Sequence, residues 1–178
     1  MAGDEQVGAG RADAEAVVRR YEPADEAAVR RVHERALLDA GTDPADVPGT
    51  ADLGWIEAAY VEPGGEFLVA EADGEVVATG GLVVDDRGGS GGDDADDPVE
   101  GELFRLAVDP DHQREGYGTA VLDGLEAAAR ERGVDRLALT TARRQAAATE
   151  FYPARGYERV GRERHGEYEL IRFEKRLD

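Results

Sequence analysis

The chain has 178 residues, a length that suits one domain with a single substantial core. Its formal net charge of -19, from 40 acidic and 21 basic residues, excludes the basic surface that nucleic-acid-binding proteins present. Cysteine is absent, which excludes disulfides, thiolate metal sites and a cysteine nucleophile together.

Lys175 is the only lysine among the basic residues. Acidic residues along the whole chain, with arginine in place of lysine, are typical of proteins that work in molar salt, where screening confines charge repulsion to short distances. We therefore expect a halophilic origin and low stability in dilute buffer. The alternative is an acidic protein from an ordinary organism, which accounts less well for a single lysine.

No part of the chain has the length of apolar sequence that a membrane span needs, and the N-terminus lacks the apolar core of a signal peptide. We therefore expect a soluble, cytoplasmic protein without a membrane partner. The three histidines, His33, His112 and His165, show no paired spacing, so we also expect no metal site.

Residues 1–15 are small, polar and aperiodic, which predicts a disordered acidic tail, and residues 16–178 are expected to form a single domain. From residue 16 to Gly41 the sequence predicts a short strand and then a helix that opens near Pro23. The apolar residues of this helix fall on one face: Ala28, Val29, Val32, Ala36 and Leu37. A second short helix is predicted within 51–65, with Leu53, Ile56, Ala59 and Tyr60 facing inward.

Two apolar runs within 65–86 are joined at Asp73 and Gly74, which predicts a β-hairpin with a tight turn. Residues 85–100 hold a dense acidic cluster and almost no side chain that could pack, so we expect a flexible surface loop. A calcium site is the weaker interpretation, because the spacing lacks the fixed ligand pattern with a terminal glutamate.

Residues 101–109 predict the next strand, and a helix with apolar residues at helical spacing follows from Gly116 to Gly133. Residues 134–141 predict another strand, and residues 143–152 predict a helix that ends at Pro153. The rest predicts a closing hairpin that turns near His165 and Gly166. The fold class is therefore a mixed α/β domain with hairpins and one βαβ unit.

The stretch VDPDHQREGYGTA, residues 108–120, places two glycines between the predicted strand and helix. Backbone N–H groups at a helix start can bind an anion, and glycine removes the Cβ atoms that would prevent close approach. A Walker loop is excluded because no Gly-Lys-Ser/Thr run exists, and the dinucleotide fingerprint fits poorly because Val121 stands where a third Gly or Ala is needed. The remaining pattern consists of Gln113, Gly116 and Gly118.

This stretch resembles the acetyl-CoA loop of the GNAT family of N-acetyltransferases. QAAATEFYPARGYERVG, residues 145–161, resembles the later helix of that family, with its Phe-Tyr and Arg-Gly-aromatic signature. Two motifs in the family order argue against a chance match, and the resemblance covers the chain from about Val17 to the C-terminus. It implies the GNAT fold, a mostly antiparallel sheet of six to seven strands with a splayed pair at the cofactor site and about four flanking helices.

The resemblance implies acetyl-CoA as the co-substrate. The residues that it places around the pyrophosphate are Gln113, Arg114, Gly116, Tyr117, Gly118 and Thr119. Backbone groups of Leu106 and Val108 would bond the acetyl carbonyl and the pantetheine arm. Gln145 would also contact the cofactor, at a position where the family commonly has asparagine.

Acyl transfer to an amine needs a base for the amine proton and an acid for the departing thiolate. Glu102 matches the glutamate that serves as base in the histone-acetylating branch of the family, and strand alternation predicts that it shares a face with Phe104 and Leu106. A solvated strand residue is the open alternative for Glu102, and Glu100 and His165 are weaker candidates for the base.

Tyr152 matches the family tyrosine that gives a proton to the coenzyme A thiolate, a role that suits a phenol with a pKa of about 10. The alternative for Tyr152 is a core aromatic residue, which is the role that we assign to Phe151 and Tyr157. Backbone N–H at Leu106 would polarise the thioester carbonyl, so no covalent acyl-enzyme is implied.

We therefore expect an N-acetyltransferase that moves acetyl from acetyl-CoA to a primary amine by direct attack in a ternary complex. The acceptor would be a small amine, an amino acid or a protein N-terminus, held between the first two helices and the last hairpin. A non-catalytic acyl-CoA-binding sensor of the same fold remains the alternative, and a dinucleotide-dependent enzyme is a weaker one. A homodimer is compatible with exposed strand edges near the C-terminus, although no residue requires it.

Overall fold

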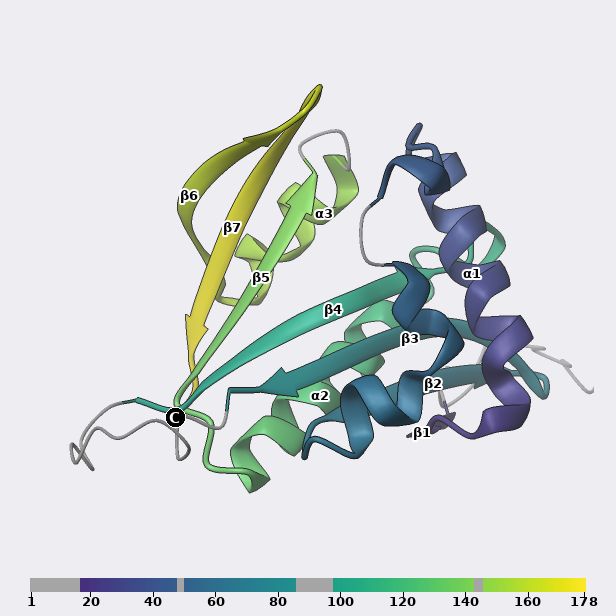
Figure 1. Ribbon diagram of the computed structural model, residues 1–178, viewed down its shortest axis with the longest axis horizontal. Helices are drawn as coiled ribbons and strands as arrows, with labels where there is room; N and C mark the ends of the chain where they lie inside the picture. The colour runs from purple at the N-terminus through teal and green to yellow at the C-terminus, as the bar shows by residue number, and fades with distance from the viewer. Residues whose placement is uncertain (1–16, 48–49, 86–97, 143–145) are drawn as a thin grey trace, which may run out of the picture.

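The computed structural model describes residues 17–47, 50–85, 98–142 and 146–178. The predicted tail at 1–15, most of the predicted loop at 85–100 and Gln145 lie outside these ranges. Within them the strands form one seven-stranded sheet in the order β1-β2-β3-β4-β5-β7-β6 (Figure 1). The strands are β1 (Val17–Arg20), β2 (Glu66–Ala72), β3 (Glu75–Val84), β4 (Glu100–Val108), β5 (Arg136–Ala142), β6 (Glu158–His165) and β7 (Tyr168–Arg176).

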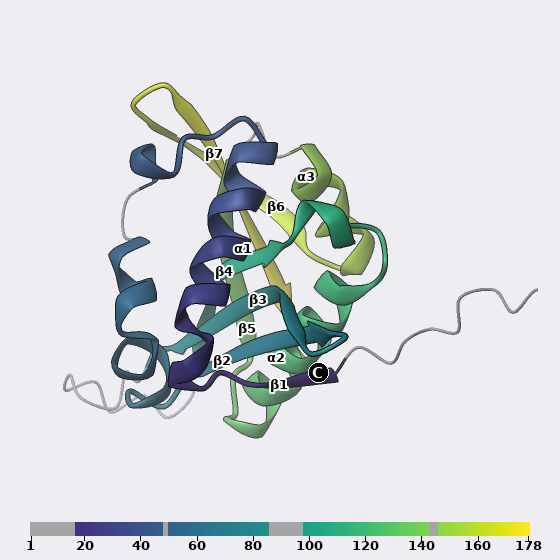
Figure 2. The same cartoon turned by 90° about the vertical axis from the view of Figure 1, so that its right-hand side faces the viewer.

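Helices cover both faces of this sheet. Figure 2 shows α1 (Glu26–Asp39) in front of the sheet and α2 (Tyr117–Glu131) behind it. Each has its own core, since Val29 and Val32 of α1 are buried with Phe67 of β2, whereas the apolar stripe of α2 packs on the opposite face. The short α3 (Ala146–Phe151) leads to Tyr152, whose ring lies on the α2 side.

Both predicted β-hairpins form, and their turns contain the residues that favour tight turns. The β2–β3 turn places Asp73 at φ 51° and Gly74 at φ 81°, and the β6–β7 turn places Gly166 at φ 61°. These left-handed conformations are the ones that glycine and aspartate adopt most readily in tight turns. The two hairpins therefore confirm the predicted strand pairs.

The predicted second helix consists of a 3-10 turn, Thr50–Gly54, followed by a π-helical turn, Glu57–Val61. Glu62 N–H donates to the Glu57 carbonyl over 2.8 Å, five residues back, and Pro63 offers no N–H with which the turns could continue. Its apolar residues still face inward as predicted: Leu53, Ile56 and Tyr60 are buried and Ala59 is partly buried. The apolar spacing thus predicted the buried face correctly and the helix type incorrectly.

The sheet splits between the only two neighbouring strands of the described residues that run parallel. β4 and β5 pair only over Glu100–Leu103 and Arg136–Leu139, whereas all other neighbouring strands are antiparallel. Beyond Leu103 the two strands diverge, and the β5-facing edge of β4 has no strand partner in the described ranges (Figure 1). This mostly antiparallel sheet with its splayed pair and flanking helices confirms the predicted fold class.

A β-bulge interrupts β4 at the point where the split opens. Two β4 residues, Arg105 and Leu106, stand where β3 offers one, and Arg105 has φ 56°. The Thr79 hydroxyl donates to the Arg105 carbonyl over 2.8 Å and holds the bulge. Phe104 consequently packs in the α1 core while Leu106 packs in the α2 core. The prediction that Glu102, Phe104 and Leu106 share one face is therefore wrong, because the bulge inverts the alternation after Phe104.

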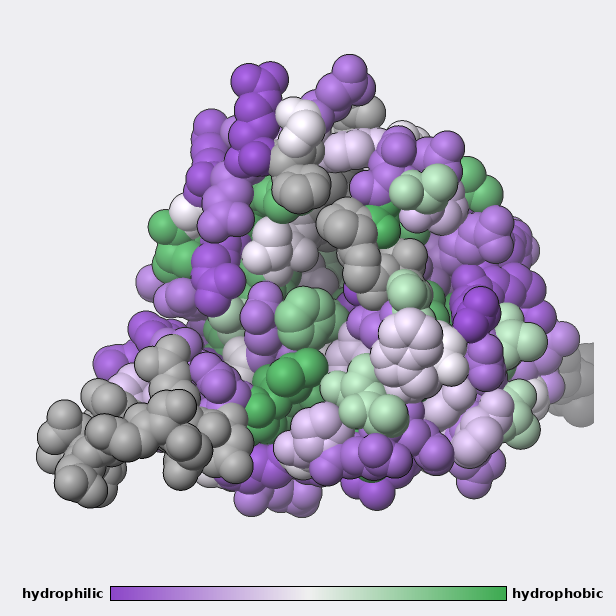
Figure 3. Space-filling model, viewed as in Figure 1, coloured by the Kyte–Doolittle hydropathy of each residue, from purple (hydrophilic) through white to green (hydrophobic). Residues whose placement is uncertain are grey.

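Figure 3 shows hydrophobic residues in the middle of one face, between the β6–β7 hairpin and α1, with hydrophilic residues around them.

No helix in the described part of the chain is both long and apolar enough to cross a membrane.

Candidate active site

Two hollows meet at the split between β4 and β5. The larger, which we call the long cleft, has a volume of about 990 Å³ and lies between α1, the end of β4, the start of α2 and α3. It is lined by eight of the nine residues predicted to contact the cofactor: Leu106, Val108, Gln113, Arg114, Gly116, Tyr117, Gly118 and Thr119. The ninth, Gln145, lies outside the described residues.

The glycines shape the loop end of the long cleft. Gly116 takes φ 90° at the N-cap of α2, a left-handed conformation that side chains disfavour. A Cβ on Gly118 would lie 3.1 Å from the Val108 side chain, so glycine allows the helix to approach the end of β4. The N–H groups of the first turn have no acceptor within the helix and lie at the cleft wall, where they can bind an anion.

A salt bridge fastens this loop to α1. Asp109, which is 4% exposed, accepts a hydrogen bond from Asp111 N–H over 3.0 Å and lies 2.7 Å from an Arg35 guanidinium nitrogen. Arg35 reaches Asp111 as well, over 3.0 Å. Both acids lie within three residues of the end of β4, so α1 holds the turn that leads from the strand to the anion-binding helix start.

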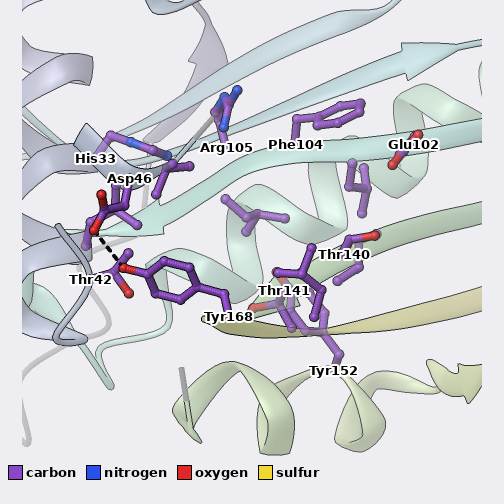
Figure 4. Close-up of a pocket in the computed structure, with 16 residues that line it drawn as sticks. His33, Thr42, Asp46, Glu102, Phe104, Arg105, Thr140, Thr141, Tyr152 and Tyr168 are labelled. Atoms are coloured by element: carbon purple, nitrogen blue, oxygen red, sulfur yellow. Dashed lines mark hydrogen bonds between the residues drawn. The ribbon is translucent and has the colours of Figure 1, made fainter. Parts of the chain in front are cut away.

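The smaller hollow, which we call the short pocket, has a volume of about 210 Å³ (Figure 4). Its walls come from α1, the segment after α1, β4, β5 and β7. The acceptor was predicted to lie between the first two helices and the last hairpin. Of these elements, α1 and the hairpin line the short pocket, whereas no described residue of the 50–61 segment does. The two hollows share four lining residues, and these mark their junction: His33, Leu37, Leu106 and Tyr152.

Tyr152 is a buried residue at this junction. It is 6% exposed, and its ring packs against Phe151, Tyr157 and Phe173 at centroid distances of 5.2, 5.6 and 5.8 Å. Burial raises the pKa of its hydroxyl, so the phenol stays protonated at physiological pH. Tyr152 therefore combines the predicted core role with a position from which it could donate a proton.

Glu102 lies on the wall of the short pocket. Burial raises its pKa, and the Arg172 guanidinium, 3.9 Å away, lowers it in opposition. A carboxylate with a raised pKa is a stronger base than an exposed one. Of the weaker candidates, Glu100 pairs with Arg136 and lines neither hollow, and the His165 side chain lies outside the description.

His33 is a junction residue that the sequence analysis considered only as a metal ligand. It is 8% exposed, and burial, with the nearby Arg105 charge, lowers its pKa to about 4. The imidazole is therefore neutral at physiological pH. A signal was available, because His33 stands one turn from Val29 and one turn from Leu37, in the middle of the apolar stripe of α1.

The outer part of the short pocket carries polar groups that the sequence analysis also missed. The Tyr168 hydroxyl donates to Asp46 over 3.0 Å, which ties β7 to the segment after α1 (Figure 4). Thr42 is 3% exposed, and its hydroxyl has no hydrogen-bond partner in the described structure. No sequence motif marks these residues, since only the fold brings 42–46 and Tyr168 together.

No group of three or more His, Asp or Glu side chains in the described ranges could hold a metal ion.

A family model described as the acetyltransferase (GNAT) family matches residues 28–157. The chain belongs to the GNAT family. The matched range includes both the glycine loop and Tyr152.

Two curated N-acetyltransferases match part of the chain. N-acetyltransferase 8 of Homo sapiens is 31% identical over 125 residues, covering 67% of this chain and 51% of that protein. The ribosomal-protein alanine N-acetyltransferase of Escherichia coli is 43% identical over 58 residues, covering 33% of this chain and 39% of that protein. The chain thus spans about half or less of the length of these curated relatives.

Solved structures share the GNAT fold. The Escherichia coli ribosomal-protein alanine N-acetyltransferase has a TM-score of 0.68 at 24% identity, covering 90% of this chain and 93% of its own. A Salmonella typhimurium protein solved with acetyl-CoA as its cofactor has a TM-score of 0.69 at 23% identity, covering 92% of this chain and 94% of its own.

Proposed function

We propose that this GNAT-family chain is an N-acetyltransferase, which transfers acetyl from acetyl-CoA to a primary amine by direct attack in a ternary complex. The observation that carries the proposal is the junction of two separate hollows at the split between β4 and β5. Two substrates could occupy them together and meet beside Tyr152. Direct transfer needs no enzyme nucleophile, in keeping with a chain without cysteine.

Acetyl-CoA would occupy the long cleft. The N–H groups of Tyr117, Gly118 and Thr119 would bind its diphosphate, with Gln113 and Arg114 beside them and Gly116 allowing close approach. The free edge of β4 at Leu106 and Val108 would bond the acetyl carbonyl and the pantetheine arm, and Gln145 would add a further contact. The Salmonella typhimurium protein of the same fold, solved with acetyl-CoA, supports this choice of co-substrate.

The reaction would need one base and one acid. Glu102, directly or through water, would take a proton from the ammonium form of the acceptor, and the free amine would then attack the thioester carbon. Leu106 N–H would stabilise the oxyanion. When the C–S bond breaks, the Tyr152 hydroxyl would protonate the thiolate. The resulting phenolate would take the second proton from the former amine nitrogen, directly or through water, and Glu102 would release the first proton to solvent, which leaves the acetamide and coenzyme A.

The acceptor would be a small amine, an amino acid or a protein N-terminus in the short pocket. The carboxylates of Asp46 and Glu102 on its walls favour a cationic amine. A protein N-terminus is supported by the Escherichia coli relative, whose name assigns it the alanine of a ribosomal protein.

The composition supports two further proposals. We infer that the chain works in a cytoplasm that holds molar salt, because its net charge of -19 and single lysine suit strong screening. We also infer that residues 16–178 act as one domain, since β1 and β7 belong to the same sheet.

The test is release of coenzyme A thiol from acetyl-CoA in molar KCl, over a panel of amines, amino acids and N-terminal peptides. Release that depends on one acceptor class is the expected result, and it would name the substrate. Silence across the panel, with acetyl-CoA still raising the melting temperature, would favour the acyl-CoA sensor. Silence without any such protection would contradict acetyl-CoA as the ligand.

A further inference from the structure

We propose that Arg155 binds a phosphate group of the cofactor, from the wall of the long cleft that faces the glycine loop. This inference rests on the proposed function, because it takes coenzyme A as the ligand of the cleft. It adds a cation at a position to which the sequence analysis gave no role.

The local fold fixes where Arg155 stands. It ends the 3-10 turn Pro153–Arg155, and its backbone N–H donates to the Tyr152 carbonyl over 3.0 Å. Gly156 follows at φ 89° and reverses the chain, with its N–H donating to the Pro153 carbonyl over 3.2 Å. The Arg155 side chain is thereby directed into the lining of the long cleft.

The Phe151 ring lies between the Arg155 guanidinium and the glycine loop. Its central carbon is 4.5 Å from the centroid of the Phe151 ring, a cation–π distance. The same ring would lie 3.9 Å from a Cβ on Gly118, in the first turn of α2. Arg155 and the N–H groups at the start of α2 therefore lie within reach of one extended anionic ligand.

The hydrogen-bonding state of Arg155 is unusual for this chain. Its Nε is buried and has no hydrogen-bond partner in the described structure, although buried N–H groups normally have one. No carboxylate in the described ranges lies within 4 Å of its guanidinium nitrogens, in a chain with 40 acidic and 21 basic residues. By contrast, Arg19, Arg35 and Arg136 each pair with acids.

A phosphate is the ligand that this arrangement fits best. A guanidinium is planar and can donate two parallel N–H bonds to phosphate oxygens, while stacking leaves its N–H edge free. Coenzyme A carries a diphosphate and a 3′-phosphate, and either could meet Arg155. The experiment separates these two groups.

The experiment measures the dissociation constants of coenzyme A and 3′-dephospho-coenzyme A by calorimetry at one fixed KCl concentration. Arg155→Met should weaken coenzyme A binding about tenfold, as expected for one charge-assisted hydrogen-bonded contact. Arg155→Lys, which keeps the charge without the planar fork, should lie between Arg155→Met and the wild type. Arg159→Met is the matched control, because it removes an exposed cation from β6 that lines neither hollow.

Loss confined to coenzyme A would assign Arg155 to the 3′-phosphate, and equal loss for both ligands would assign it to the diphosphate. Unchanged affinity for both ligands in a variant with the wild-type melting temperature would overturn the inference. An equal loss in Arg159→Met would overturn it as well, since the effect would then come from overall charge. A wild-type chain that binds neither ligand would overturn the proposed function, and this inference with it.

Discussion

At the scale of single residues, burial raises the pKa of both Tyr152 and Glu102, with different chemical consequences. For the phenol it preserves the proton that a departing thiolate needs. For the carboxylate it strengthens the base that an ammonium group needs. Burial thus suits Tyr152 to donate a proton and Glu102 to accept one in the proposed reaction.

Tyr152→Phe should lower kcat by about 10²-fold or more, the usual contribution of a general acid, and should leave acetyl-CoA affinity unchanged. Tyr157→Phe is the matched control, because the Tyr157 hydroxyl donates to Glu126 over 3.0 Å and lines neither hollow. Steady-state kinetics with the acceptor found in the panel make the comparison. An unchanged kcat in Tyr152→Phe would remove the acid role.

Glu102→Gln should lower kcat/KM by about 10²-fold at neutral pH and should abolish the rise of rate with pH that a carboxylate base produces. The control is Glu100→Gln, two residues earlier on β4, where the carboxylate pairs with Arg136 away from both hollows. A full pH–rate profile is the measurement. Equal losses in the two variants would indicate that Glu102 is a solvated strand residue.

His33 should make stability depend on pH. Its folded pKa of about 4 lies below its ordinary value of 6.5, so the unfolded chain binds the extra proton between these values. The free energy of unfolding should therefore fall as the pH drops from 6.5, by about 3 kcal/mol in total near pH 4. Other acids also titrate near the lower end, so the difference between the wild type and His33→Gln in urea unfolding isolates this histidine. A difference that does not change with pH would contradict the buried, neutral imidazole.

At the scale of elements, the bulge in β4 depends on packing from several directions. The Tyr60 hydroxyl donates to Asp52 over 2.6 Å, and Asp52 accepts from Arg105 over 3.1 Å, so the 50–61 segment steadies the bulged residue. Gly81 lies beneath the Tyr60 ring, where a Cβ would come within 2.7 Å of a ring carbon. Because Gly81 has no side chain, the Tyr60 ring can pack close to β3, where its hydroxyl bonds Asp52, the partner of Arg105.

Gly81→Ala should lower the free energy of unfolding by about 1–3 kcal/mol, the usual cost of overpacking a filled core. Gly161→Ala in β6 is the control, since a Cβ there would meet no atom within 4 Å. Urea unfolding of both variants at one KCl concentration gives the comparison. Equal stability of the two alanine variants would contradict the close packing beneath Tyr60.

How far the sequence could predict these elements depends on the range of the forces involved. The turn at Asp73 and Gly74 and the helix start at Gly116 follow from local backbone chemistry, and both were predicted correctly. The bulge at Arg105 was not predicted, because it needs Thr79 and Asp52, which are distant in the chain. An arginine at positive φ carries no local signal of its own, unlike the glycine and aspartate of the tight turns.

The same limit applies to the candidate site. Residues of the glycine loop share one motif, so the resemblance placed them together before the fold was known. His33 and Asp46 reach the short pocket only because α1 and the segment after it lie over the split sheet. Their sequence signal was weak, a single polar residue on an apolar stripe and an aspartate in a Pro-rich loop.

At the scale of the whole molecule, the net charge of -19 opposes compactness in dilute salt. Ion pairs such as Glu126 with Lys175, at 2.9 Å, offset only part of this repulsion, because acids outnumber bases by 40 to 21. The Debye length falls from about 10 Å at 0.1 M salt to about 3 Å at 1 M. Repulsion between acids that are not in direct contact should therefore almost vanish in molar KCl.

The melting temperature should rise steeply between 0.1 and 1 M KCl and then more slowly. Salt also stabilises proteins by exclusion from their surfaces, so the test needs a variant with fewer charges. Replacing the exposed Glu75, Glu131 and Glu163 by Gln should raise stability at 0.1 M KCl, and this advantage should shrink as salt increases, because screening removes the repulsion that the substitutions relieve. If the difference in melting temperature between the two proteins stays the same at every KCl concentration, the salt effect comes from exclusion. That result would contradict adaptation of this surface to molar salt.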